Sequence, residues 1–308
     1  MRDEKKAFQL LGETSASIYP LAGDIMGSLI EKYFTERRFY QPLFLAFQLT
    51  PEPLSADLFC KRTPYTNPAA VKDLLVDTTE AGYLKPAGRK GFRASKKGAD
   101  AIETVHKLFY KRLNEINQFP EEKLTSLTDL LGRLVDSASQ TNFQNNGVCL
   151  DISRNGHPPV EIGSLARVDQ LLDDLNAFRD DAHIAAWKPV GVDGHTWETL
   201  SFVWNGQANT AEKLLELLPF RYYALEDYTS ALEDLADRGW IEPAAEGYTV
   251  TDVGKKIRDG AESDTDDNYF SAWKVLIDDE LALLGEFLSA LKETNLKLAA
   301  EINPEKGE

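Results

Sequence analysis

Apolar residues recur at helical spacing through most of the chain. Between Asn67 and Gly82, positions i, i+3, i+4 and i+7 form one stripe made of Val71, Leu74, Leu75 and Thr78. Similar spacing or helix-start signals predict further helices. They cover residues 5–36, 41–49, 55–60, 98–116, 124–139, 164–188, 196–204, 224–239 and 269–295, and a further helix is expected to start at 209.

Two segments about 157 residues apart have the same pattern. Residues 80–98 are EAGYLKPAGRKGFRASKKG, and residues 237–254 are DRGWIEPAAEGYTVTDVG. Four positions align between the two copies when one residue is deleted between the second and third of them. The aligned pairs are Gly82 with Gly239, Pro86 with Pro243, Phe92 with Tyr248 and Gly98 with Gly254. Each copy predicts the end of a helix, a strand, a tight turn, a second strand and a new helix. An internal repeat of this kind constrains the whole fold.

This order of elements is that of a winged helix. We therefore predict a mainly α fold with small β-wings, in which two tandem winged helix-turn-helix domains are joined by long helices. The predicted parts are an N-terminal helical segment (1–39), a first, basic domain (40–118), a helical and loop connector (119–193), a second, acidic domain (194–262) and a C-terminal packing or dimerisation helix (263–308).

Local signals set several of the expected boundaries. Ser55 is expected to cap one helix, and Asn67, Pro68 and Gly82 mark the N-cap, first position and C-terminal end of the next. In the second domain, Thr196 is expected to cap a helix that ends at Trp204. Asn209, with Glu212 three residues later, indicates a capping box. Residues 140–163 predict a loop with a short strand at 148–152.

The arrangement resembles the MarR-type winged helix-turn-helix regulators, in which helices at both ends of the winged domain form a dimerisation layer. The resemblance rests on the helices that end at Gly82 and Gly239, on the aromatic–aliphatic strand starts Tyr83-Leu84 and Trp240-Ile241, and on the strand-to-helix step 248–254. The first copy departs from the pattern, with Ser95 where Thr251 stands. Residues 178–239 are also similar to single-chain, SalK-like helix-turn-helix proteins with two such units. The resemblance covers about half of the chain and implies a tandem regulator.

Composition limits the class of protein. The chain has 308 residues, 43% of them hydrophobic, and no apolar run of the roughly 20 residues that a membrane helix needs. It begins MRDEKK without an apolar segment behind, so no signal peptide is expected. Cys60 and Cys149 are the only cysteines, too few for a disulfide framework. We expect a cytoplasmic protein without membrane contact.

Charge is distributed unevenly. The formal net charge is −16, which disfavours nonspecific binding to nucleic acid. Residues 37–116 nevertheless carry 14 Lys and Arg against 8 Asp and Glu, so the rest of the chain has a balance of −22. The first domain is therefore the part in which we expect contact with double-stranded DNA. The expected DNA-binding residues are Asn67, Lys72, Lys85, Arg89, Lys90, Arg93, Lys96 and Lys97.

The second copy lacks these cations. Between Gly239 and Gly254 it has Glu242 and Glu246 and no Lys or Arg, and its third helix carries Glu226, Asp227, Glu233 and Asp234. We expect this surface to repel DNA and to serve as a protein contact or as structure. The basic hairpin of the first copy (85–98) also has an alternative interpretation, a solvated hairpin whose lysines only keep the protein soluble.

A second constellation lies where the long helix 164–188 meets the second domain. The expected ligand-binding residues are Arg179, Asp180, His183, Trp187, His195, Trp197 and Trp204. Trp side chains beside a His and an Arg could bind an aromatic or anionic effector. The alternative is that the tryptophans are core residues and that the charged groups form a salt-bridge network between domains.

The sequence contains no recognised catalytic motif, neither a phosphate loop, a nucleophile elbow, HExxH nor paired CxxC. The four histidines have no metal-ligand spacing, so we expect no enzyme, no cofactor and no metal site. The leading interpretation is a transcriptional regulator that contacts DNA through its first domain, responds to a small effector and forms a homodimer through its terminal helices. The alternative is a winged-helix protein that does not bind DNA and serves as a small-molecule or protein-binding module.

Overall fold

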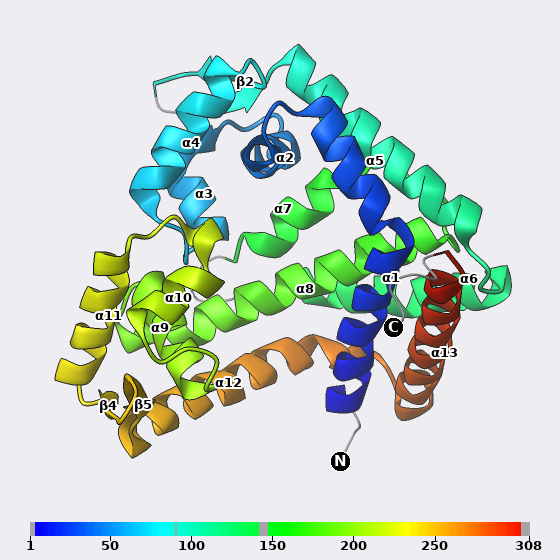
Figure 1. Ribbon diagram of the computed structural model, residues 1–308. Coiled ribbons are helices and arrows are strands. Elements are labelled where there is room, and N and C mark those ends of the chain that lie inside the picture. The colour runs from blue at the N-terminus through cyan, green and yellow to red at the C-terminus, as the bar shows by residue number, and fades with distance from the viewer. Residues whose placement is uncertain (1–3, 90, 142–146, 303–308) are drawn as a thin grey trace.

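The computed structural model describes residues 4–89, 91–141 and 147–302, and the predicted DNA contact Lys90 lies outside them. The chain is mainly helical, with two small antiparallel sheets (Figure 1). Helix α8 (Leu165–Trp187) crosses the middle of the molecule, and α12 (Asp252–Ser271) runs beside it. No helix among the described residues is long and apolar enough to span a membrane.

The first predicted domain contains three helices, a β-hairpin and a long exit helix. They are α2 (Tyr40–Gln48), α3 (Ala56–Arg62), α4 (Pro68–Glu80), β2 (Leu84–Ala87), β3 (Gly91–Ala94) and α5 (Lys96–Ile116). A short 3-10 turn, η1 (Arg37–Phe39), comes before α2. The predicted caps are confirmed: Ser55 Oγ accepts from the amide of Leu58, and Asn67 Oδ1 accepts from that of Ala69. Gly82 has a left-handed φ of 80° just after α4, where glycine costs least.

One strand of this sheet was not predicted. Strand β1 (Leu54–Ser55) pairs antiparallel with β3, and the sheet order is β1-β3-β2. The hairpin register places Lys85 opposite Arg93 and Pro86 opposite Phe92.

The second predicted domain has the same order of helices and hairpin. It consists of α9 (Gly194–Trp204), α10 (Ala211–Leu217), α11 (Leu225–Asp237), β4 (Ile241–Pro243) and β5 (Tyr248–Val250), followed by α12, with 3-10 turns η2 (Lys188–Val190) and η3 (Pro219–Arg221). Two predicted caps are wrong. Asp193, three residues before Thr196, caps α9, and Thr210 rather than Asn209 caps α10. The side chain of Asn209 instead donates to the carbonyl of Glu246 in the hairpin.

The step from hairpin to exit helix is made by the same hydrogen bonds in both domains. Ser95 Oγ donates to the carbonyl of Gly82 and accepts from the amide of Gly98. Thr251 Oγ1 donates to the carbonyl of Gly239 and accepts from the amide of Gly254. Ser95 therefore makes the same two bonds in the first copy as Thr251 does in the second, although Thr251 Oγ1 also lies 3.1 Å from the carbonyl oxygen of Trp240.

The connector is more helical than expected. It forms α6 (Glu121–Ala138), α7 (Cys149–Gly156) and α8. The strand predicted at 148–152 is wrong, because these residues begin α7, whose first amides donate to the carboxylate of Asp181 on α8. Residues 142–146 of the predicted loop lie outside the described part of the chain.

The helix predicted over 269–295 is wrong as a single element. Helix α12 ends at Ser271, η4 (Ala272–Val275) follows, and α13 (Asp278–Ile302) starts afresh. Helix α13 packs against α1 (Glu4–Tyr33), as the sequence predicted for the terminal helices. Thr14 donates to the carbonyl of Leu288, Asn295 donates to Ser17, and Lys292 pairs with Glu13.

Three buried clusters hold these parts together. One is centred on the first predicted domain around Leu43, Phe59 and Leu75 and also takes in the end of α1, and one is centred on the second around Trp197, Leu214 and Leu235. The third, largest in its membership, joins α1, α6, α8 and α13 with the buried end of α12 and the C-terminal part of α5. The helices that flank the two domains therefore share a core of their own, to which the exit helix of the first domain also contributes.

Candidate nucleic-acid interface

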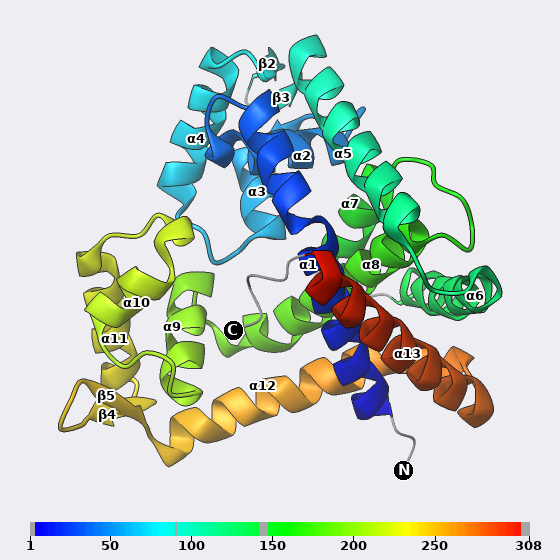
Figure 2. The same cartoon turned by 45° about the vertical axis from the view of Figure 1, so that its right-hand side comes forward.

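Helix α4 is the candidate recognition helix of the first domain. Its predicted stripe, Val71, Leu74, Leu75 and Thr78, is buried, so the opposite face reaches solvent. That face exposes Lys72, Asp73, Val76 and Glu80, a mixed surface rather than a basic one. Both views place α4 and α11 on the same side of the molecule (Figures 1 and 2).

The hairpin β2–β3 is the most basic part of this side. Lys85 and Arg93 are exposed on paired strands, and Arg89 is exposed in the turn next to Gly88. None of these three cations forms an ion pair within the described residues. Their charges are therefore available to a polyanion, as are those of the likewise unpaired Lys72.

Two further predicted DNA contacts, Lys96 and Lys97, have partners inside the protein. Lys96 pairs with Asp100 one turn along α5, at 2.7 Å. Lys97 Nζ donates to the carbonyl of Ala81 and lies 4.0 Å from the centre of the Tyr83 ring. Lys97 thus closes the end of α4 against the start of α5, which is a structural role.

Asn67 is part of a joint between the two domains. Its backbone N–H donates to the carbonyl of Arg221, and its side-chain Nδ2 donates to the carbonyl of Tyr222. Because Asn67 begins α4, these bonds bring the start of α4 against the turn that precedes α11. The position is less accessible to DNA than the sequence suggested.

The same joint contains Arg221 and Tyr65, which the sequence did not single out, beside Glu198 and Trp187. Arg221 binds Glu198 of α9 with Nη2–Oε1 at 2.7 Å and Nε–Oε2 at 3.0 Å, and lies over the ring of Tyr65. Burial raises the pKa of Glu198, while the hydrogen bond from Arg221 acts to lower it. Tyr65 in turn accepts a hydrogen bond from the indole of Trp187. Only the fold brings these distant residues together, and no local pattern predicts them.

The second hairpin presents the opposite charge at equivalent places. Glu242 lies opposite Thr249 on β4–β5, where the first hairpin pairs Lys85 with Arg93. Glu242 and Glu246 are exposed, and so are Glu226, Asp227 and Glu233 on α11. Asp234 is half-buried and pairs with Arg238. This surface repels a phosphate backbone.

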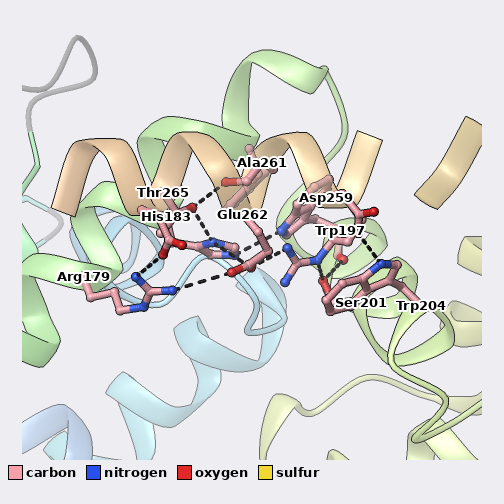
Figure 3. Close-up of polar contacts among 12 residues, drawn as sticks. Arg179, His183, Trp197, Ser201, Trp204, Asp259, Ala261, Glu262 and Thr265 are labelled. Carbon is pink, nitrogen blue, oxygen red and sulfur yellow. Dashed lines mark hydrogen bonds and ion pairs between the residues drawn. The ribbon is translucent and has the colours of Figure 1, made fainter. Parts of the chain in front are cut away.

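The predicted ligand residues are only partly brought together (Figure 3). Arg179 and His183 of α8 face α12, where Arg179 pairs with Asp266 at 3.2 Å and with Glu262 at 3.6 Å. His183 Nδ1 lies 3.2 Å from the hydroxyl of Thr265, and its Nε2 accepts from the indole of Trp197. Both ring nitrogens are used within the protein.

The tryptophans continue this network. Trp187 stacks on Trp197 with ring centres 5.8 Å apart, and Trp204 donates to Asp259. Arg258 of α12 is buried, lies 4.7 Å from the Trp204 ring and pairs with Glu262. The acidic stretch of α12, which the sequence analysis did not include, therefore supplies most of the partners.

Two members of the predicted set lie elsewhere. Asp180 pairs with Arg62 of α3 at 2.8 Å rather than with His183. His195 is buried and stacks on Tyr223, with ring centres 3.7 Å apart. The geometry favours the structural alternative, a network that ties α12 to α8 and α9, and a ligand role for these residues stays a prediction. Within the described ranges, no three His, Cys, Asp or Glu side chains are placed to hold a metal ion.

Comparison with known proteins identifies the class of fold. Residues 118–300, more than half of the chain, match the model of a helix-turn-helix family. The match includes α10 and α11 of the second predicted domain and leaves out the first. No curated protein and no solved structure matches the chain. The chain therefore belongs to this helix-turn-helix family.

Proposed function

We propose that this helix-turn-helix protein is a transcriptional regulator that binds duplex DNA chiefly through its first predicted domain (40–118). The observation that carries the proposal is the reversal of charge between two equivalent hairpins. Lys85, Arg89 and Arg93 are exposed on the β2–β3 hairpin and form no ion pair among the described residues, where β4–β5 has Glu242 and Glu246. The proposal keeps the cytoplasmic location expected from the sequence.

The proposal includes a tandem winged-helix architecture of MarR-like type. Its support is the matching order of elements and the matching hydrogen bonds of Ser95 and Thr251. Two units in one chain would then replace the two protomers of a dimeric regulator. The homodimer expected from the sequence is not part of this proposal, because α13 already packs against α1 of the same chain.

Affinity in this arrangement comes from the phosphate backbone. A hairpin that lies along the duplex positions its cations on phosphates, and each contact releases condensed counterions without reading sequence. Lys72 on the exposed face of α4 is the cation best placed to accompany the hairpin, since Asn67 is engaged in the joint.

A second candidate is a winged-helix module that binds a protein or a small molecule and not DNA. The observation in its favour is the acidic face of α11, together with the net charge of −16. A basic protein partner would suit that face better than a nucleic acid.

The deciding experiment is duplex binding by fluorescence anisotropy at several salt concentrations, with DNA that includes the gene's own upstream region. Replacing Lys85, Arg89 and Arg93 together by Ala should weaken binding and reduce the slope of log K against log salt by roughly 3. The matched control, Glu242→Ala with Glu246→Ala, should not weaken it. If the wild type binds no duplex at low salt, the proposal of a DNA-binding regulator is wrong. The second candidate, a module that binds a protein or a small molecule, then replaces it.

A further inference from the structure

A polar cavity of about 320 Å³ lies between the first predicted domain and α8. It is lined by residues of α2 and α3, of α7 with the following His157, and of α8. The side chains that line it are mostly polar, which is unusual between packed helices. None of the residues predicted for DNA binding lines this cavity.

Two of the lining side chains are deeply buried and have no hydrogen-bond partner. Gln48 of α2 is 8% exposed and Ser153 of α7 is 7% exposed. Neither side chain forms a hydrogen bond within the described residues, although buried polar groups are satisfied in the great majority of cases. The amide of Gln48 packs directly on Gly156, where any side chain would overlap it. Both groups line the cavity, so their polar atoms are available to a ligand inside it.

The cavity also carries an excess of negative charge. Arg62 balances Asp180, and His157 binds Asp174 through Nε2 at 2.9 Å. Asp173 has no hydrogen bond or ion pair within the described residues. Asp173 lines the cavity but remains exposed on its outer side, and partial desolvation raises its pKa to about 6, with His157 opposing the shift. The carboxylate is therefore mainly ionised at neutral pH and has no counter-ion among the described residues.

We propose that this cavity binds a small hydroxylated amine, an amino alcohol or an amino sugar of one ring. The ammonium group would face Asp173, and the hydroxyl groups would meet Gln48 and Ser153. The volume lies at the lower end of the range for small-molecule sites, which excludes larger ligands. Phe44 adds an aromatic wall, against which an organic cation is favourable.

Such a ligand would join two parts of the molecule. Gln48 belongs to the first predicted domain, whereas Ser153 and Asp173 belong to the connector helices α7 and α8. Binding would therefore stabilise the docking of the first domain on α8. The proposal does not depend on DNA binding, and its test needs no DNA.

The test is isothermal titration calorimetry of the full chain with three amines and their uncharged counterparts. The pairs are ethanolamine with ethylene glycol, serinol with glycerol, and glucosamine with glucose. We expect at least one amine to bind at least about tenfold more tightly than its counterpart, which corresponds to about 1.4 kcal/mol. Asp173→Asn should remove the preference for the amine over its uncharged counterpart. Ser153→Ala should weaken binding of the amine but leave that preference in place.

Asp151→Asn is the matched control, because Asp151 is an exposed carboxylate on α7, the helix that carries Ser153, and does not line the cavity. Thermal melting of each variant checks that it is folded. The proposal is overturned if none of the three amines binds, which would leave a cavity filled by water alone. Equal affinity within every pair, or an equal loss in Asp151→Asn, would also overturn it.

Discussion

The indole Nε1–H of Trp197 donates a hydrogen bond to Nε2 of His183 across 3.2 Å. The Thr265 hydroxyl donates to the carbonyl of Ala261, so it accepts from Nδ1–H of His183 on the other side of the ring. The imidazole is thereby held neutral in one tautomer, with no free acceptor for a second proton. Burial lowers the pKa of His183 to about 4, and nearby Arg258 acts in the same direction.

This relationship predicts a dependence of stability on pH. The folded pKa of His183 lies below its usual value near 6.5, so the unfolded chain takes up the proton first as pH falls. The stabilisation is present above about pH 6.5 and is lost toward pH 4. Between pH 7 and pH 5 this group should remove about 2 kcal/mol from the free energy of unfolding.

The measurement is urea unfolding of the wild type and of His183→Gln at pH 7 and pH 5. The variant should be less stable at pH 7, because it disturbs the bond from Trp197, yet it should lose less stability between the two pH values. An identical loss in both proteins would contradict the assignment to His183.

The joint between the domains gives a second prediction. Arg221→Ala would leave the largely buried carboxylate of Glu198 without its cation, and should lower the free energy of unfolding by about 2 kcal/mol. Glu198→Ala and the double variant complete a mutant cycle. A coupling energy near zero would show that the pair contributes nothing to the joint.

Two glycines give a third prediction. A Cβ at Gly98 would overlap the carbonyl oxygen of Tyr83, and one at Gly254 would overlap that of Trp240. Gly98→Ala and Gly254→Ala should therefore each cost about 1–3 kcal/mol, as overpacking does. Gly132 in α6 has open space around it, so Gly132→Ala should stabilise by about 0.5–1 kcal/mol. Thermal unfolding of the three variants measures these changes in stability. An equal change in all three would show that the strand-to-helix step is not closely packed.

The fourth prediction concerns the second hairpin and rests on the proposed function. If β4–β5 occupies a place equivalent to that of β2–β3 on DNA, Glu242→Lys should strengthen duplex binding and steepen its salt dependence by about one unit. Glu301→Lys makes the same change of charge at an exposed position near the end of α13. An equal gain in both variants would attribute the effect to net charge alone.

The sequence by itself determined the local elements. The N-caps at Ser55 and Asn67 and the left-handed glycines 82 and 239 lie where their neighbours predict, because capping depends on amides within three residues. The two hairpins followed from the repeated spacing of glycine and aromatic residues. At the start of α9 the local pattern predicted Thr196 as the cap, whereas Asp193, three residues earlier, is the cap in the structure.

Only the tertiary structure decided how these elements meet. The break between α12 and α13 could not be predicted locally, because residues 271–278 contain no proline or glycine. Arg133 of α6 binds the carbonyl of Val275 and the carboxylate of Glu280, which in turn accepts from the amide of Ile277. Likewise, the joint at Asn67 and Arg221 and the cavity beside Asp173 join side chains more than 100 residues apart in the sequence. Periodicity identifies the buried face of each helix, whereas the helix that it faces depends on packing across the whole chain.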